Sequence, residues 1–299
     1  MQYQKQVICC IAALLLNVCT VPVLLNRLSL HQKLKLKLIQ PDVISVSMPL
    51  PDNMSATEVQ ETFEILTSGF ETQYPDFGIE LKIYENPEEI SDISDMYINY
   101  RPEIQTVDIS EIARELSQDN YFLSFSEFHE AVPLSFGISV LYYDMSDITL
   151  FQKLSGMKTI TPEQFPEDVV TDTEPAAFQA FLENPKHPVI FPLSGMQKAE
   201  QNPHSSGRVH MMPVLYQNQP EVYHSNFCYI NSASSRNHQK IAMLWTEYLL
   251  SGEAQNILFA EHYGDLPVHR QAFDKAVSQH QEYYALQEIK PVLEENAHE

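Results

Sequence analysis

Apolar residues form one long run near the start of this chain and short periodic segments after it. The run extends for 19 residues, from Val7 to Leu25, and is interrupted only by Asn17, Thr20 and Pro22. A helix of this length is just long enough to cross the hydrocarbon core of a bilayer, which is about 30 Å thick. The run therefore predicts a signal sequence or a membrane anchor.

The segments that follow have the periods of strands and helices. Residues 43–48 are rich in apolar side chains and predict a short strand, and a capping box of Ser55 and Glu58 predicts the start of a helix. Residues 79–84 alternate apolar and polar positions and, with residues 95–100, predict two more strands. This order of elements is typical of a parallel α/β sheet. The apolar face of the helix comprises Val59, Phe63, Leu66, Phe70 and Tyr74.

The middle of the chain is less regular. Residues 132–144 form a long β-rich run with a central glycine, which fits either one buried strand or a strand that leaves one lobe and enters another. Residues 157–188 are interrupted by prolines and predict a single short helix at 176–182. Residues 189–191 predict a strand, and the polar turn that follows it at 192–196 is of the kind that lines pockets.

The last third of the chain predicts a strand and two helices. The strand covers residues 227–231, the first helix covers 237–250, and Ser251 caps a second helix that extends through Ala260. One face of the first helix is apolar and contains Trp245, the only tryptophan of the chain. We therefore expect Trp245 in the core.

Charge is distributed unevenly along the chain. The first 40 residues hold five of the 18 basic side chains and no Asp or Glu, so residues 41–299 hold 13 basic against 40 acidic side chains, a net charge of about −27. A body of this charge repels phosphate backbones, which argues against nucleic-acid binding. The five basic residues are Lys5, Arg27, Lys33, Lys35 and Lys37.

The N-terminal segment fits a cleaved signal, an uncleaved anchor or a lipoprotein signal. Leu16 lies three residues before Cys19, as in bacterial lipoproteins, which would place a lipid on Cys19; Val18 departs from that pattern, which has Gly, Ala or Ser before the Cys. Three of the four cysteines lie in this segment and leave Cys228 alone in the body. We therefore expect no intramolecular disulfide and no cysteine-based zinc site.

Motifs of common enzyme classes are absent from the sequence. Ser194 has no G-x-S-x-G elbow around it, the 11 histidines include no H-E-x-x-H, and no G-x-x-x-x-G-K is present. The sequence therefore favours a binding protein over an enzyme.

Two blocks of the sequence carry recognisable motifs. Residues 251–255 (SGEAQ) follow a predicted helix, and residues 264–267 (GDLP) follow them. This pair resembles the S-P-E-A-Q and G-x-L-P pair of carbohydrate-type (family 1) extracellular solute-binding proteins of ABC importers. Residues 132–144 are similar to the interlobe strand of that family, with Asp144 where Asn is usual. The resemblance covers roughly residues 43–273, in the same order.

The resemblance implies a two-lobed α/β fold of the periplasmic-binding-protein type (type II), with mixed sheets flanked by helices and an N-terminal membrane segment in front. It implies a signal or anchor with a stalk at 1–40, a first lobe at 41–136 plus 228–266, and a second lobe at 137–227 plus 267–299. Helical material expected between Phe165 and Phe178 is missing. The second lobe is therefore expected to be reduced.

The function implied is capture of a small solute, a carbohydrate, between the two lobes by hinge closure. The implied partners are ABC permease subunits, and the implied protein is a monomer held on the extracytoplasmic face of the cell membrane, without a cofactor or a bound metal. Two alternatives stay open. One is an anchored sensor or interaction protein that no longer delivers cargo; the other is a receptor for a cation or polyamine, which converging carboxylates in the cleft would indicate.

Candidate ligand-binding residues follow from their positions at the ends of the predicted strands, where open α/β sheets bind ligands. They are Asp52 and Asn53 after the first strand, Asn99 and Tyr100 after the third, Ser135 and Phe136 in the crossing strand, and Ser194, Gly195 and Met196 in the second lobe.

Overall fold

The computed structural model describes residues 41–51, 54–90, 93–110, 116, 120–122, 125, 128–171, 173–260 and 264–296. The expected membrane segment, the stalk, Cys19 and two candidate ligand residues, Asp52 and Asn53, lie outside the described residues. Within the described part of the chain, no helix is both long enough and apolar enough to cross a bilayer.

The first described elements form the predicted parallel unit. They are β1 (Asp42–Pro49), α3 (Ala56–Gln73), β2 (Phe77–Tyr84) and β3 (Met96–Ile98). Strand β1 pairs in parallel with β2 and with β3. The capping box of Ser55 and Glu58 is present, and the predicted face of α3 is buried at Val59, Phe63, Leu66 and Phe70. Local sequence signals therefore predicted this unit correctly.

Most of the remaining elements are short; the exceptions are two strands, at 132–144 and 222–230, and two helices, at 236–249 and 270–279. The middle of the chain forms β4 (Val132–Asp144), α5 (Ile148–Leu154), α6 (Pro175–Glu183), β5 (Val189–Pro192), α7 (Gly195–Gln201), β6 (Val209–Pro213), β7 (Leu215–Tyr216) and β8 (Gln219–Pro220). The last part forms β9 (Val222–Ile230), α8 (Arg236–Leu249), α9 (Gly252–Gln255), a π-helical turn (Asn256–Ala260), β10 (Leu266–Pro267), α10 (Arg270–Gln279), a 3-10 helix (Gln281–Glu288) and α11 (Lys290–Asn296).

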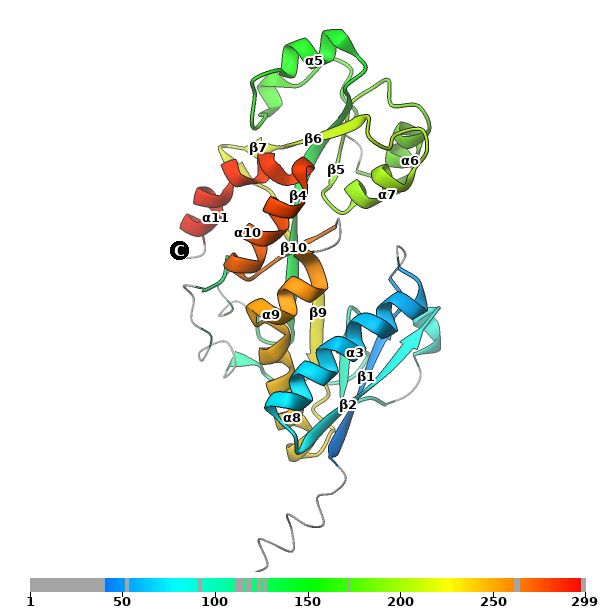
Figure 1. The fold of residues 1–299 in the computed structure, drawn as a ribbon, viewed down its shortest axis with the longest axis vertical. Coiled ribbons are helices and arrows are strands. Elements are labelled where there is room, and N and C mark those ends of the chain that lie inside the picture. The colour runs from blue at the N-terminus through cyan, green and yellow to red at the C-terminus, as the bar shows by residue number, and fades with distance from the viewer. Residues whose placement is uncertain are drawn as a thin grey trace, which may run out of the picture.

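These elements form two lobes, one above the other in Figure 1. The lower lobe contains β1, β2, α3, α8 and α9, together with β3, which pairs with β1. The upper lobe contains β5, β6, α5, α6 and α7, with α10 and α11 at its side. A mixed sheet continues through both lobes in the order β10-β4-β9-β3-β1-β2, with β5 and β6 also paired to β4.

Strand β4 is the long strand that the sequence predicts, and both interpretations of it hold. All of its residues are buried, and it passes from one lobe to the other. Its first half pairs antiparallel with β9, and its second half pairs with β5 and β6. Ser139 lies where the neighbour of β4 changes from β9 to β6. Its backbone N–H donates to the Glu221 carbonyl, and its own carbonyl accepts from the Val214 N–H.

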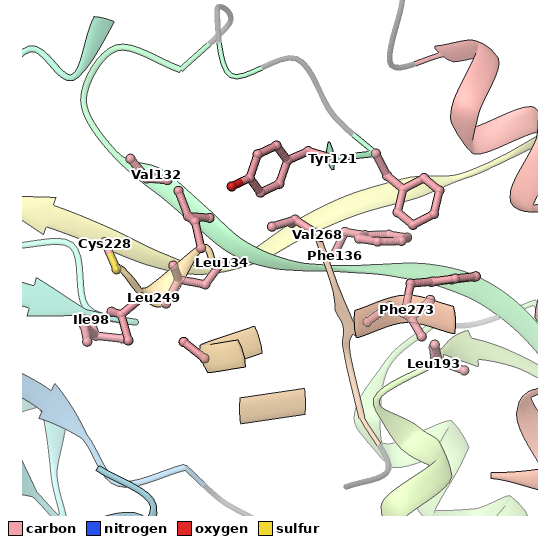
Figure 2. Packing of buried hydrophobic residues seen from close by; sticks show 14 of the residues in the cluster. Ile98, Tyr121, Val132, Leu134, Phe136, Leu193, Cys228, Leu249, Val268 and Phe273 are labelled. Atoms are coloured by element: carbon pink, nitrogen blue, oxygen red, sulfur yellow. The ribbon is translucent and has the colours of Figure 1, made fainter. Parts of the chain in front are cut away.

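One hydrophobic core extends along β4 through both lobes. Its members on β4 are the even-numbered residues from Val132 to Tyr142, and Figure 2 shows part of this core. Phe136 stacks on Phe273 of α10 with ring centroids 6.4 Å apart. The odd-numbered residues between Pro133 and Leu141 are small instead: Ser135, Gly137 and Ser139. This difference leaves room for other groups on the second face of β4.

Candidate functional site: a cleft between the lobes

A cleft with a volume of about 570 Å³ lies between the lobes. Its size is in the range of small-molecule sites. It is lined by Met48, Pro49, Leu50, Pro51, Met54, Val59, Thr62, Phe63, Pro87, Ile98, Asn99, Leu134, Phe191, Ser194, Gly195, Gln197, Lys198, Asn226, Leu258, Phe259, Gly264 and Asp265. The lining therefore comes from both lobes and from the segments that cross between them.

The wall contributed by the lower lobe is apolar. Met48 is the next-to-last residue of β1, Val59 and Phe63 belong to the buried face of α3, and Ile98 ends β3. Each of these four side chains is at most 5% exposed. The wall is therefore an extension of the lower-lobe core, and it offers a ligand shape and apolar contact.

The wall contributed by the upper lobe is mainly polar and is formed by α7. Ser194 and Lys198 are exposed there, and Gln197 lies between them. Gly195 begins the helix against a stacked aromatic pair, Phe178 and Phe191, whose centroids are 4.2 Å apart. A Cβ at Gly195 would lie 2.7 Å from the Phe178 ring, so α7 can approach this pair only with glycine there.

The floor of the cleft consists of residues on the crossing segments. Leu134 lies on β4, Asn226 on β9, and Gly264 and Asp265 just before β10. The backbone N–H of Gly264 donates to the Tyr283 hydroxyl, which donates back to the Gly264 carbonyl. These bonds fix the segment that carries Asp265.

Asp265 is the titratable side chain of the floor, and its surroundings shift its pKa. Burial raises the pKa of its carboxyl, and the nearby hydroxyls of Ser225 and Tyr223 lower that pKa only in part. The Ser225 hydroxyl donates to Asp265 Oδ2 over 2.5 Å. Asp265 Oδ1 is buried and has no hydrogen-bond partner. A low-polarity environment and a free acceptor therefore coincide at the floor.

Two asparagines of the lining have left-handed backbone conformations, with φ of 55° at Asn99 and 54° at Asn226. The other described non-glycine residues with positive φ, Gln217 and Asn218, form the two-residue turn of the β7–β8 hairpin, where a type I′ turn requires positive φ at both positions. No such turn explains the pair in the cleft. Uncommon backbone conformations of this kind concentrate at functional sites.

The structure brings some of the predicted ligand residues to the cleft and not others. Asn99, Ser194 and Gly195 line it. Ser135, Phe136 and Met196 are fully buried and are not among the lining residues, and the half-buried Tyr100 ring packs 6.0 Å from Tyr97. Their role in binding a ligand stays a prediction.

Sequence reasoning missed the two side chains that dominate the floor, Asn226 and Asp265. Asp265 was visible only as the variable position of the G-x-L-P block. The predicted polar turn at 192–196 was also incomplete, because helix α7 begins within it at Gly195. A helix of this length that begins with glycine has too few periodic positions to predict. Among the described residues, no cluster of three or more His, Cys, Asp or Glu side chains could hold a metal ion.

No protein-family model matches the chain, and no curated protein matches its sequence. Solved structures do match its fold. The maltodextrin-binding protein MalE1 from L. casei BL23 aligns with a TM-score of 0.60 and 13% identity, over 84% of this chain and 86% of that one. An ABC transporter solute-binding protein from Thermotoga lettingae TMO, bound to α-D-tagatose, aligns with a TM-score of 0.54 and 11% identity, over 83% and 87%.

UgpB from Mycobacterium tuberculosis, in complex with glycerophosphocholine, aligns with a TM-score of 0.53 and 12% identity, over 84% of this chain and 86% of that one. At these identities the likeness is one of fold, and it extends over most of each chain. The mixed α/β architecture predicted from the sequence is thus confirmed, and this chain has the two-lobed fold of the solute-binding proteins of ABC transporters.

Proposed function

We propose that this chain captures a small carbohydrate in the cleft between its lobes and presents it to the permease subunits of an ABC importer. The observation that carries the proposal is the cleft itself, which is lined by both lobes and by the crossing segments. A solute held there contacts both lobes at once, so its binding energy favours the closed arrangement of a hinged protein.

The matched structures support a sugar as the solute. They include a maltodextrin-binding protein, a protein bound to α-D-tagatose and one with mannotriose bound. An apolar wall for the faces of sugar rings and a set of amides and hydroxyls for their hydroxyl groups are both present, at Phe63, Asn99 and Asn226 among others. The proposed process is binding and release, with no chemical step.

The alternative of a polyamine receptor has less support. Asp265 is the single carboxylate among the described lining residues, and Lys198 lies on the rim of the same cleft. A polyamine carries several positive charges and needs several carboxylates in reach. The lining therefore favours an uncharged solute.

The remaining parts of the proposal concern the whole protein. We place its lobes at 41–136 plus 228–266 and at 137–227 plus 267–299, the second one reduced, and we expect a monomer. The apolar run of residues 7–25 would hold the protein on the extracytoplasmic face of the membrane, as an anchor or as a signal with lipidation at Cys19.

Thermal unfolding of residues 41–299 with a panel of neutral sugars, from monosaccharides to trisaccharides, tests the proposal. A sugar at about 100 times its Kd stabilises the folded state by about 2.7 kcal/mol, and we expect Tm to rise by at least about 5 °C. Spermidine serves as the comparison for the polyamine alternative. If no sugar raises Tm, the proposed function is wrong; if a sugar binds and the cells do not import it, the sensor alternative replaces the transport role.

A further inference from the structure

Among the described residues, three segments cross between the lobes, and one chain of hydrogen bonds joins them. Ser135 lies on β4, Ser225 and Asn226 on β9, and Asp265 on the segment that leads from α9 in the lower lobe to α10 beside the upper lobe. The hydroxyls of Ser135 and Ser225 are 2.8 Å apart, and the Ser225 hydroxyl donates to Asp265 Oδ2. The Asn226 side-chain amide donates to Ser135 over 2.7 Å. We call these four residues the crossing network.

The crossing network ends at an unused acceptor. Asp265 Oδ1 is buried without a hydrogen-bond partner, and Asp265 lines the cleft. Leaving a buried polar atom unpaired costs about 1 to 3 kcal/mol, and more for a charged group. A donor that reaches this atom, either the neighbouring Tyr223 hydroxyl or a hydroxyl of a solute in the cleft, removes that cost.

The backbone of β9 is distorted where it supports the network. Ser135 pairs with Ser225 and Pro133 with Phe227, while Leu134 and Asn226 between them are unpaired, at the residue where φ is 54°. The Leu134 carbonyl accepts instead from the Gln255 side chain over 3.0 Å. Such distortions persist only where the surroundings enforce them, and here they direct the Asn226 side chain to Ser135.

One protein group near Asp265 could donate a hydrogen bond to Oδ1. The Tyr223 hydroxyl is close enough to lower the pKa of Asp265, yet in this conformation it has no hydrogen-bond partner. Lys198 is exposed on α7. The competing possibility is that Tyr223 moves and donates to Oδ1 when the lobes close, which would leave nothing for a solute to satisfy.

We propose that Asp265 Oδ1 accepts a hydrogen bond from one hydroxyl of the bound sugar and makes the cleft selective for neutral over anionic sugars. This inference rests on the proposed function. An anionic sugar, such as a uronate, would bring a second negative charge toward a largely buried carboxylate, where water screens the repulsion less than at an exposed one. The same hydrogen bond connects the sugar to all three crossing segments through the crossing network.

Calorimetric titration of D265N, with the neutral sugar that binds wild type most tightly, provides the first test. Loss of a hydrogen bond to a charged acceptor is expected to weaken binding about 10- to 100-fold. The matched control is D274N, which removes the same charge from an exposed position on α10, and its Kd is expected to stay within about twofold. D265N should keep its fold, because the substitution removes a buried unpaired charge; its thermal unfolding without sugar checks this.

Monodeoxy analogues of that sugar separate direct contact from indirect support. One analogue should bind wild type about 10-fold more weakly than the parent sugar, and D265N should bind that analogue and the parent equally well. A role of Asp265 only in holding β10 or Tyr223 would weaken all analogues alike. The series is completed by the Kd values of glucose, glucuronate and glucosamine, the last of which offers an ammonium donor. Wild type should bind glucose more tightly than glucuronate, and the ratio of these two Kd values should be smaller for D265N.

The outcomes distinguish this inference from the proposed function. Wild type that binds no sugar contradicts the proposed function. Wild type that binds a sugar, with D265N within twofold of it, contradicts the inference alone and points to Tyr223 as the partner of Oδ1. Equal affinity of wild type for glucose and glucuronate also contradicts the inference.

Discussion

The two walls of the cleft differ in how they are built. The lower wall includes core side chains of β1, α3 and β3, of which Phe63 is 5% exposed. The upper wall consists of the short helix α7, with exposed polar side chains at Ser194 and Lys198, and of Phe191 on β5 beside it. A change in the lower wall therefore alters the fold and the site together, whereas the polar positions of the upper wall can vary with little effect on stability. The difference indicates that the shape of the cleft is fixed by one lobe and its polarity is adjusted by the other.

The largest expected effect separates the two walls by a matched pair of substitutions. F63A removes a ring from the lower-lobe core and should lower the free energy of unfolding by about 3 kcal/mol or more. F191A removes the half-buried ring that stacks on Phe178 in the upper wall and should cost about 1 to 2 kcal/mol. Urea unfolding measures both values. Equal costs would mean that the two walls are equally part of the core.

A smaller effect is expected on the crossing strand β4, at Gly137. The Tyr223 ring lies across this glycine so closely that a Cβ there would overlap it. G137A should therefore lower the free energy of unfolding by about 1 to 3 kcal/mol. In a Y223A background the same substitution should cost less than about 0.5 kcal/mol, because the overlapping ring is gone. If the cost is the same in both backgrounds, the close approach does not limit residue 137.

The smallest effect concerns the ionic contacts that hold each lobe. In the lower lobe, His238 of α8 contacts Asp95 over 2.9 Å and Asp42 over 3.3 Å. The hydrogen bond with Asp95 raises the pKa of His238, and partial burial opposes this shift. The charged form therefore stabilises the fold below the unfolded pKa of about 6.5, and this contribution is lost as the pH rises through the higher folded pKa.

Wild type should therefore lose up to about 1 kcal/mol more stability than H238Q between pH 6 and pH 8.5, the small value reflecting partial exposure. The comparison in the upper lobe is the contact of Asp144 with Arg208 over 2.5 Å. Hydrogen bonds from Ser146 and Arg208 outweigh burial and lower the pKa of Asp144, so that contact is lost only in acid. D144N should show the same pH dependence as wild type in this range. A parallel loss in H238Q and wild type would assign the effect to another group.

The elements predicted from the sequence are those with strong local signals. The capping box at Ser55, the periodic face of α3 and the alternation in β2 are each signals within fewer than 20 consecutive residues, as α3 itself spans 18. The structure confirms the helix and the strand that they predict. Trp245 is in the core, with 0% exposure, as its position on the face of α8 predicted. Local periodicity is sufficient for such elements because one face packs on one surface.

The floor of the cleft could not be predicted in the same way. Asp265 reaches it only because the chain crosses between the lobes for a third time, and the Asn226 side chain is held by a hydrogen bond to Ser135, which lies about 90 residues earlier. One sequence feature could have pointed there. The alternating small residues Ser135, Gly137 and Ser139, in a strand that is otherwise large and apolar, mark the face that the crossing network and Tyr223 occupy.

The pairing at Ser139 has a practical consequence for protein engineering. Strands β6 and β9 pair with the same edge of β4. Residues 214–221 leave that edge at Ser139 and return to it at the same residue, and the excursion forms the β7–β8 hairpin. The tip at Gln217 and Asn218 is a turn outside the main sheet. A fluorescent domain inserted there would join the chain next to the passage between the lobes while the sheet keeps its pairing, which makes the hairpin a natural position for a reporter of closure.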